Sequence, residues 1–478
     1  MEKHWSELQE FNAEKTNMHA DKKYELVVIG GGSAGSTAAK WAVKRGISVA
    51  LVERHLLGGT CLNYGCDPTK ALLHTAGLLH AAKLSEPLGL RFPEAGLDWP
   101  AVVARIGRLI DQIRGGSAED AVKRQEGRGI HVYQGEASFT SNHEISVDGQ
   151  TIRGGRFLLA TGSDPVVPPI EGLDKVGFVT NREAVTLERL PKTLAVIGAG
   201  PVGTEFAQMF SRFGSRVTLF EMEDHILPHE ETALAKELAE SLRDEGLHIQ
   251  SGATVENARE TDAGEKRIVW KDNEGEHSLD VEEILVASGR KAALEALNLD
   301  AAGVATDKGK LVVDENLRTS VPLIWAAGDI TERFPFTHVA AAQALHAARN
   351  AFSEDPEAFN YNAISWAIFT DPALAHVGAT SRELEAEERP FNTLEAPFAS
   401  MPRNLLTGNQ DGRVRLLVDP DSGIVLGGHL LGAGADDLIA PVIVAMRHGL
   451  PVQALADTVF PYPTSSEAVG AAAKQYFK

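Results

Sequence analysis

Two cysteines, Cys61 and Cys66, carry the most specific chemistry in this sequence. They are the only cysteines among its 478 residues, and both lie in the segment GGTCLNYGCDPTKALLH at positions 58–74. The Ala/Leu-rich stretch that follows predicts a helix whose first turns hold both thiols. A helix N-terminus favours the reactive thiolate, and a disulfide in a reducing cytoplasm is catalytic rather than structural. The pair therefore predicts a redox-active disulfide, with two unrelated buried thiols as the structural alternative.

An internal repeat precedes the cysteines and returns later in the chain. Residues 24–53 read YELVVIGGGSAGSTAAKWAVKRGISVALVE, and residues 192–221 read KTLAVIGAGPVGTEFAQMFSRFGSRVTLFE. Each copy has a strand pattern, a GxGxxG turn, a helix-like segment and a second strand that ends in glutamate. A single GxGxxG motif is weak evidence, but two copies with the same internal spacing predict two dinucleotide-binding units.

The glycines have the same expected roles in both copies. The first allows a tight turn, the second lets the backbone approach a pyrophosphate, and the third lets the helix pack closely on the strand. The helix N-terminus offers N–H groups and partial positive charge to phosphates, and the final glutamate can accept hydrogen bonds from a ribose. These positions are Gly30, Gly32, Gly35 and Glu53 in the first copy, and Gly198, Gly200, Gly203 and Glu221 in the second.

Composition excludes several classes of protein. The length predicts two to four domains, and no apolar run is long enough to span a bilayer. The net charge of −20 argues against nucleic acid and anionic membranes as partners. The charged N-terminal stretch has no apolar core typical of a secretory signal. We therefore expect a cytoplasmic enzyme.

The end of the chain, from about residue 350, contains no nucleotide fingerprint. Its segments RVRLLVD, GIVLGGHLLG and DLIAPVIVAMRHG predict strands followed by a helix. The expected fold is therefore α/β, with two Rossmann-like dinucleotide-binding domains and a C-terminal α+β domain.

Together these motifs resemble the class I pyridine nucleotide-disulfide oxidoreductases, the family of dihydrolipoamide dehydrogenase, glutathione reductase and mercuric reductase. The resemblance runs from about residue 24 to the C-terminus and includes the CxxxxC segment, both fingerprints, ATG at 160–162, the SGR of ASGRKA and AAGD at 326–329. It implies a homodimer and four parts of the chain. These are an N-terminal extension (1–23), a discontinuous FAD-binding domain (24–162 and 285–350), an NAD(P)-binding domain (163–284) and a dimerisation domain (351–478).

The resemblance also implies catalytic roles. Cys61 is the interchange thiol that meets the substrate, and Cys66 is the charge-transfer thiolate that lies against the flavin. Lys70 and Glu205 match the pair that sits near flavin N5 in the family. The helix that opens at Thr337 would direct its positive end at the flavin pyrimidine.

The same resemblance assigns the remaining cofactor positions. FAD would be held by the first fingerprint with Glu53, and Asp329 would bind its ribityl chain. The further positions expected to bind the cofactors are Gly59, Thr60, Thr161, Gly162 and Gly289.

The expected electron donor is NADH. A carboxylate at Glu221 accepts a hydrogen bond from the ribose 2′-OH of NADH and repels the 2′-phosphate of NADPH. No arginine follows Glu221 directly, because the sequence continues MEDHILP. Arg216 or His225 could still reach a phosphate, so NADPH stays the second choice.

The C-terminal segment FPYPTSSEAVG (460–470) departs from the family pattern. Disulfide-reducing members supply a His–Glu dyad here from the other subunit, and the histidine carries the proton during thiol–disulfide exchange. Glu467 is kept, but Tyr462 occupies the histidine position. A tyrosine hydroxyl ordinarily ionises near pH ~10 and is a poor base at neutral pH. Mercuric reductases also have a tyrosine here, yet this chain lacks their additional C-terminal cysteine pair.

Other histidines could serve as the base. His338 follows Thr337, His74 ends the segment that contains the cysteines, and His429 lies in the C-terminal domain. Each is more typical of a structural, hydrogen-bonded histidine than of a catalytic one.

We therefore expect an FAD-dependent NAD(P)H oxidoreductase that passes electrons through Cys61 and Cys66 to a small-molecule acceptor, either a disulfide or a thiol-reactive oxidant. No resident metal is expected. Three alternatives stay open: a mercuric reductase-like metal-ion reductase, a dihydrolipoyl dehydrogenase subunit of a lipoyl complex, and a flavin diaphorase or quinone reductase in which the cysteines matter little.

Overall fold

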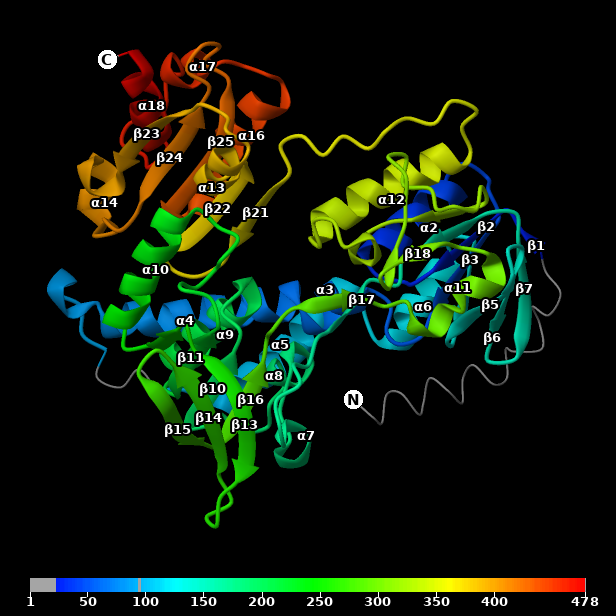
Figure 1. Cartoon of the computed structure of the whole chain (residues 1–478), viewed down its shortest axis with the longest axis horizontal. Coiled ribbons are helices and arrows are strands. Elements are labelled where there is room, and N and C mark those ends of the chain that lie inside the picture. Colours follow the sequence, from blue (N-terminus) through cyan, green and yellow to red (C-terminus); the bar gives the residue numbers. More distant parts are fainter. Residues whose placement is uncertain (1–22, 93–95, 478) are drawn as a thin grey trace. The chain divides into compact units, whose positions relative to one another are not determined.

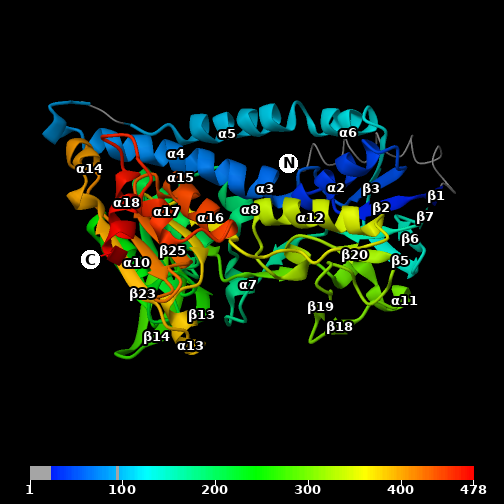
Figure 2. The same cartoon turned by 90° about the horizontal axis from the view of Figure 1, so that it is seen from above.

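A computed structural model describes residues 23–92 and 96–477 (Figures 1 and 2). The expected N-terminal extension, residues 1–23, therefore lies outside the described residues except for its last residue. The chain divides into two compact units. The first contains the described residues up to Thr69 together with Val103–Val166 and Arg290–Asn360, and the second contains Lys70–Val102, Val167–Gly289 and the chain from Tyr361 onward. The four-part division expected from the sequence stays a prediction.

The first unit is built on a five-stranded parallel sheet in the order β20-β8-β2-β3-β4. Its central strands are buried along their whole length, as the uninterrupted apolar sequence predicts for a parallel sheet covered on both faces. The strands are β2 Leu26–Ile29, β3 Val49–Glu53, β4 Ile130–Gln134, β8 Phe157–Leu159 and β20 Ile324–Ala326.

Two alanine-rich helices pack against each other in this unit. They are α2 Ser33–Val43, which follows the first fingerprint, and α12 Thr337–Ala351 (Figures 1 and 2). Their buried alanines belong to one core cluster. Because alanine has only a methyl side chain, the two helices can approach closely, which places the N-terminus of α12 beside the fingerprint.

Smaller elements complete the first unit. A four-stranded sheet has the order β1-β7-β6-β5, and two strand pairs are formed by β9 with β17 and β18 with β19. Helices α4 and α5 contain residues of both units. The bounds are β1 Lys23–Tyr24, β5 Ala137–Ser141, β6 Glu144–Val147, β7 Gln150–Gly154, β9 Ser163–Pro165, β17 Arg290–Ala292, β18 Thr306–Asp307, β19 Lys310–Leu311, α3 Gly59–Tyr64, α4 Cys66–Lys83, α5 Trp99–Arg114, α6 Ala118–Glu126, α11 Leu299–Ala302, η3 Glu295–Leu297 and η4 Asp329–Thr331.

The second unit contains the second copy of the repeat. A four-stranded parallel sheet has the order β12-β11-β10-β16, and a three-stranded antiparallel sheet has the order β13-β14-β15. The elements are β10 Thr193–Ile197, α9 Pro201–Phe213, β11 Arg216–Glu221, α10 Thr232–Asp244, β12 His248–Ser251, β13 Thr254–Glu260, β14 Lys266–Asp272, β15 Gly275–Val281, β16 Glu283–Val286, η2 Glu86–Leu88, α7 Leu173–Val176 and α8 Asn181–Ala184.

The same unit carries a five-stranded antiparallel sheet, β21-β22-β25-β24-β23, formed by the C-terminal residues. The strands are β21 Ser365–Ile368, β22 Ala373–Gly378, β23 Asn392–Pro397, β24 Arg413–Val418 and β25 Val425–Gly432. Helices accompany this sheet at α13 Ser381–Ala386, η5 Phe398–Ser400, α14 Pro402–Thr407, α15 Ala435–Leu438, α16 Ala440–Arg447, α17 Val452–Ala456, α18 Glu467–Ala473 and η6 Lys474–Phe477. The expected fold class, two Rossmann-like parts and an α+β part, is confirmed.

A polar row crosses this C-terminal sheet, with one residue from each strand in register. Its members in strand order are Trp366, His376, His429, Arg415 and Glu395. His376 stacks on Trp366 with ring centroids 3.7 Å apart and meets His429 edge-on at 4.7 Å. Glu230, just before α10, accepts a hydrogen bond from Trp366 Nε1 at 2.7 Å and lies 3.0 Å from His376 Nδ1.

None of the helices in the described residues combines the length and apolar composition that crossing a membrane requires.

Candidate active site

The first fingerprint has the backbone geometry that its glycines predict. Gly30 has a φ of +106°, and a Cβ there would lie 2.2 Å from the carbonyl oxygen of Ala160. A Cβ on Gly35 would lie 1.8 Å from the Gly30 oxygen, because α2 crosses the strand end at this point. At Gly32, in contrast, a Cβ would meet only the Cα of Gly59, at 3.8 Å. The turn is therefore closed on its protein side and open where a pyrophosphate would lie, so these residues fit a dinucleotide.

The second fingerprint repeats this geometry. Gly198 has a φ of +99°, and its Cβ would lie 2.6 Å from the oxygen of Ala287. A Cβ on Gly203 would lie 1.8 Å from the Gly198 oxygen, whereas a Cβ on Gly200 would meet nothing within 4 Å. The residues of this second turn fit a dinucleotide for the same reason.

The two glutamates at the strand ends are held in the same way. Glu53 accepts hydrogen bonds from the Gly31 and His55 N–H groups, both at 2.7 Å. Glu221 accepts hydrogen bonds from the Ala199 N–H at 2.8 Å and from the Glu223 N–H at 3.1 Å. Both residues are buried, and burial raises the pKa of the Glu53 carboxyl while the His55 and Gly31 N–H groups oppose that rise. Each carboxylate is thus fixed in direction, and each oxygen keeps a second lone pair for a ribose hydroxyl.

The cysteines do not share the first turns of one helix, so this expectation was wrong. Cys61 lies in the short helix α3, and Cys66 is the first residue of α4. Gly65 separates them with φ −126° and ψ −113°, which is outside the helical region. A Cβ at Gly65 would lie 3.0 Å from the oxygen of Thr60. The glycine therefore permits a break that turns the two thiols towards each other.

The two cysteines are not joined by a disulfide in this structure, and their thiols form a hydrogen bond with each other. This bond, followed by burial, raises the pKa of the Cys61 thiol, while the Thr337 hydroxyl opposes the rise. The expected lowering of the thiol pKa by a helix N-terminus is therefore wrong for Cys61 in the reduced pair. Cys66 Sγ lies 3.3 Å from Thr337 Oγ1, the first side chain of α12.

The structure describes the other positions that are expected to bind the cofactors. Asp329 Oδ2 accepts a hydrogen bond from Ser163 Oγ at 2.7 Å, and that hydroxyl accepts from Arg290 Nε at 2.8 Å. Thr161 donates to the Ala293 carbonyl at 2.8 Å, so its hydroxyl proton is already used. The remaining expected positions are Gly59 and Thr60 at the start of α3, Gly162 with a φ of +73°, and Gly289 with a φ of +119° in the second unit.

Lys70 and Glu205, which match a pair of residues in the family, form an ion pair in this structure. Lys70 Nζ donates to both carboxylate oxygens of Glu205, at 2.9 and 2.7 Å. The Glu205 side chain is only 5% exposed, and that of Lys70 is 33% exposed. Sequence reasoning missed a third member, Phe369, whose backbone N–H donates to Glu205 Oε1 at 2.9 Å. Nothing in the sequence around Phe369 signals this contact, because it joins segments far apart in the chain.

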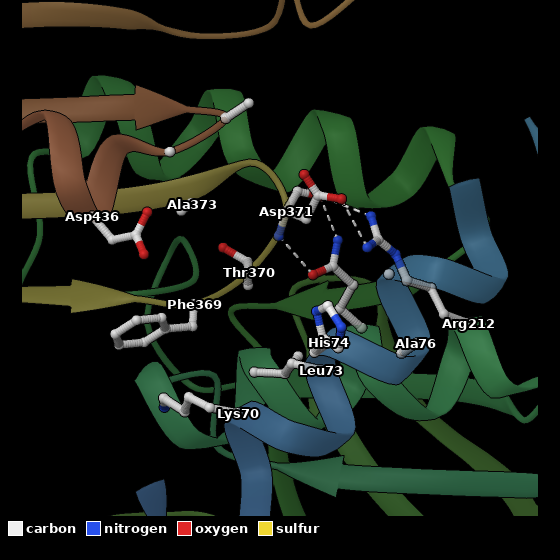
Figure 3. Close-up of a pocket in the computed structure, with 14 residues that line it drawn as sticks. Lys70, Leu73, His74, Ala76, Arg212, Phe369, Thr370, Asp371, Ala373 and Asp436 are labelled. Carbon is white, nitrogen blue, oxygen red and sulfur yellow. Dashed lines mark hydrogen bonds and ion pairs between the residues drawn. The ribbon is translucent and has the colours of Figure 1, made fainter. Parts of the chain in front are cut away.

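A cavity of about 250 Å³ adjoins this ion pair within the second unit. Figure 3 shows Lys70 and Phe369 at one side of the cavity and Arg212 with Asp371 at another. Leu73 and His74 of α4 line the wall between them.

Tyr462 and Glu467 lie in the C-terminal part of the second unit. The Tyr462 side chain is 74% exposed. Glu467 begins α18, and its carboxylate accepts a hydrogen bond from the Thr464 N–H at 3.1 Å. Glu467 thus stabilises the start of its own helix.

The other candidate bases differ in accessibility. His429 is completely buried, and its Nε2 lies 3.0 Å from the carbonyl oxygen of Ala379. Burial, the neighbouring His376 and then Arg415 lower the pKa of His429 well below its ordinary value, although the Ala379 carbonyl opposes this. His74 is exposed at the cavity wall, and His338 stacks on Phe336 with ring centroids 5.9 Å apart. Among residues 23–92 and 96–477, no three His, Cys, Asp or Glu side chains gather in a way that could hold a metal ion.

Two family models match almost the whole chain. Residues 24–344 match the model described as pyridine nucleotide-disulphide oxidoreductase. Residues 364–473 match the model described as the dimerisation domain of the same family.

Individual proteins of known kind are similar over nearly the full length. A mercuric reductase from Streptomyces lividans is 35% identical over 466 residues, which cover 96% of this chain and 97% of the relative. A dihydrolipoyl dehydrogenase from Haloferax volcanii is 34% identical over 461 residues, covering 94% of this chain and 95% of the relative. Among solved structures, the HOCl-induced flavoprotein disulfide reductase RclA from Escherichia coli is similar, with a TM-score of 0.83 and 30% identity, covering 94% of this chain and 99% of that one.

Proposed function

Because the chain belongs to the pyridine nucleotide-disulphide oxidoreductase family, we propose that it uses NADH to reduce a disulfide acceptor through Cys61 and Cys66. At the level of the family it is an FAD- and pyridine nucleotide-dependent flavoprotein disulfide oxidoreductase. The observation that carries the proposal is the pair of hydrogen-bonded thiols at the junction of α3 and α4, with Cys66 next to Thr337.

FAD would be held by the first fingerprint with Glu53, and Asp329 would bind its ribityl chain. When bound, FAD supplies hydride acceptance from the nicotinamide and two-electron transfer to the cysteine pair. The first helix turn of α2 offers its N–H groups to the pyrophosphate, and Glu53, fixed by two backbone bonds, accepts from the adenosine ribose.

NADH would be held by the second fingerprint. The buried Glu221 carboxylate, oriented by the Ala199 N–H, favours a free 2′-OH over a 2′-phosphate. The acidic residues that follow, Glu223 and Asp224, add repulsion against NADPH. The ring nitrogen Nδ1 of His225 lies 2.8 Å from the carbonyl oxygen of Ile226, which leaves only its other nitrogen for a phosphate.

The cysteines would reduce the acceptor by two thiol–disulfide exchanges. Cys61 sulfur attacks one sulfur of the acceptor, whose S–S bond breaks, and the first acceptor thiol leaves with a proton. Cys66 sulfur then attacks the mixed disulfide, the second acceptor thiol leaves with a proton, and the Cys61–Cys66 disulfide forms. One NADH and one solvent proton return the pair to two thiols.

A soft metal ion is the second candidate acceptor. Cys61 needs a base before it can attack a disulfide, because its hydrogen bond to Cys66 raises the pKa of its thiol, and Tyr462 replaces the usual histidine. A thiophilic cation displaces thiol protons when it binds, so it does not need that base. The likeness to mercuric reductases supports this candidate. The absence of a third cysteine ranks it second, since no other thiol can deliver the metal.

The test compares acceptors side by side. NADH oxidation by the purified FAD-containing enzyme is measured with lipoamide, a small aromatic disulfide, thiol-chelated Hg(II) and a quinone. The proposal expects disulfide turnover that Cys61→Ser and Cys66→Ser both abolish. Turnover with Hg(II) alone would identify a metal-ion reductase, and full turnover of Cys61→Ser with quinone would identify a diaphorase. Co-purification of a lipoylated protein would identify a subunit of a lipoyl complex.

The dimerisation domain supports a homodimer, and the complete site would then use the C-terminal segment of both subunits. A reducing cytoplasm fits an enzyme whose two cysteines must return to thiols in every cycle.

A further inference from the structure

Phe369 contacts both members of the Lys70–Glu205 ion pair. Its backbone N–H donates to Glu205 Oε1 at 2.9 Å, and its ring centroid lies 4.5 Å from Lys70 Nζ. The first contact fixes a buried carboxylate, and the second places an ammonium against an aromatic ring, where the electron-rich face attracts it. One residue therefore restrains the negative and the positive end of the pair together.

The loop that carries Phe369 is held by one face of α9. Glu205, Gln208 and Arg212 follow each other at helical spacing on that face. The Gln208 side chain makes two hydrogen bonds with the backbone of Asp371. Its Nε2 donates to the Asp371 carbonyl at 2.6 Å, and its Oε1 accepts from the Asp371 N–H at 2.9 Å. Arg212 donates to the Asp371 carboxylate at 3.0 Å. The position of the ring is thus set by backbone contacts to the helix that also carries Glu205.

The ring is not a buried core side chain. It is 38% exposed and lines the cavity of about 250 Å³ beside Lys70 (Figure 3). A lysine side chain has four rotatable bonds, and without a second restraint its ammonium could leave the carboxylate and point into the cavity. The ring centroid lies 4.5 Å from the ammonium, and both side chains line the cavity.

We propose that Phe369 is a positioning residue that fixes the ammonium of Lys70 on Glu205. This inference rests on the proposed function and on the family resemblance, which implies that the Lys70–Glu205 pair acts near flavin N5, where the hydride of NADH is accepted. A fixed positive charge at that point stabilises the electron pair that arrives, and a mobile one must first be reoriented. Phe369 acts through Lys70 and takes no part in the chemistry itself.

The main test measures the rate of flavin reduction by saturating NADH in the FAD-containing enzyme. Phe369→Leu keeps the backbone N–H but removes the ring, and it is expected to slow reduction about threefold to tenfold with little change in the apparent Kd for NADH. Phe369→Tyr keeps an aromatic face, so its flavin should be reduced at the wild-type rate. Phe92→Leu is a matched control, because Phe92 is an exposed phenylalanine that does not line the cavity, and it should leave the rate unchanged.

A double variant decides whether Phe369 acts through Lys70. Lys70→Met should slow reduction more than Phe369→Leu does, and adding Phe369→Leu to Lys70→Met should slow it no further. Full activity of Phe369→Leu, or defects that multiply in the double variant, would overturn the inference.

A measurement without the cofactor separates this inference from the proposed function. Competitive acylation of the Lys70 amine in the apoprotein should become about threefold to tenfold faster in Phe369→Leu and stay unchanged in Phe369→Tyr and Phe92→Leu. If NADH does not reduce the wild-type flavin, the proposed function fails, while the acylation result still decides whether Phe369 holds Lys70. Equal acylation rates in wild type and Phe369→Leu would show that it does not.

Discussion

Cys66 Sγ lies 3.3 Å from Oγ1 of Thr337, although 271 residues separate the two in the chain. Thr337 is the first residue of α12, so its hydroxyl and the N-terminus of that helix both present positive character to the region of the thiol. A hydroxyl hydrogen bond favours the thiolate over the thiol. The same hydroxyl lowers the pKa of Cys61, against the larger opposing effects of Cys66 and burial.

Thr337→Val should therefore make the cysteine pair less reactive. Valine has the same shape but cannot donate a hydrogen bond, so the thiolate loses stabilisation. The rate of alkylation of the reduced enzyme by iodoacetamide at pH 7 should fall about threefold to tenfold. Thr337→Ser, which keeps the hydroxyl, is the matched control and should react like wild type. Equal rates in Thr337→Val and wild type would show that the contact does not tune the pair.

Glu221→Gln should weaken the preference for NADH. The amide keeps the shape of the side chain but removes the charge that repels a 2′-phosphate and accepts most strongly from a 2′-OH. The ratio of kcat/KM for NADH to that for NADPH should fall by about tenfold, mostly through KM.

The corresponding change in the first repeat provides the control for this prediction. Glu53→Gln alters a carboxylate held by matching backbone bonds, and it should reduce FAD retention without changing the nucleotide ratio. A wild-type enzyme that prefers NADPH would contradict the role given to Glu221.

Tyr462→His should raise activity on small disulfides if proton transfer limits them. Tyr462 is 74% exposed in the single chain, so a histidine can be accommodated there without repacking the core of its own subunit. An imidazole can accept the Cys61 proton near neutral pH, and kcat/KM for a small disulfide should rise at least about tenfold at pH 7. Tyr462→Phe controls for the hydroxyl and should show no such rise. A correctly folded Tyr462→His dimer without any gain would argue that another group handles the proton.

The polar row in the C-terminal sheet predicts a loss of stability in mild acid, because its member His429 is completely buried. Burial lowers the pKa of His429 well below its ordinary value, with His376 and Arg415 adding to the effect. The unfolded chain therefore takes up a proton below pH ~6.5 that the folded chain does not. For this one group the free energy of unfolding should fall by up to about 1.4 kcal/mol per pH unit between pH ~6.5 and 5.

Urea unfolding at pH 7.5, 6.5 and 5.5 measures this slope. The glutamine of His429→Gln can still donate to the Ala379 carbonyl but cannot titrate. The slope of the free energy of unfolding against pH should therefore lose the contribution of about one proton. His143→Gln, at an exposed histidine, should not change it. An identical slope in wild type and His429→Gln would exclude His429 as the titrating group.

Much of the site was predictable because its signals are local. Each fingerprint places three glycines and a glutamate within one βαβ unit, where short-range geometry fixes the offsets, and the structure shows nearly identical environments for both copies. The Lys70–Glu205 pair, expected from the family resemblance, is present although 135 residues separate its members. The break at Gly65 was missed because the helical pattern continues across it, and only a close approach to Thr60 shows that the chain turns there.

The sequence alone determined the fold class, with two dinucleotide-binding units and an α+β C-terminal part, and it predicted a redox-active cysteine pair. Such features depend on residue types at fixed short spacing, and that spacing can be read directly from the amino-acid sequence. Only the tertiary structure decided that Thr337 contacts Cys66, that Phe369 contacts the Lys70–Glu205 pair, and that His429 is buried while Tyr462 is exposed. These relationships join distant segments, and they arise from the packing of helices and sheets, which no local pattern encodes.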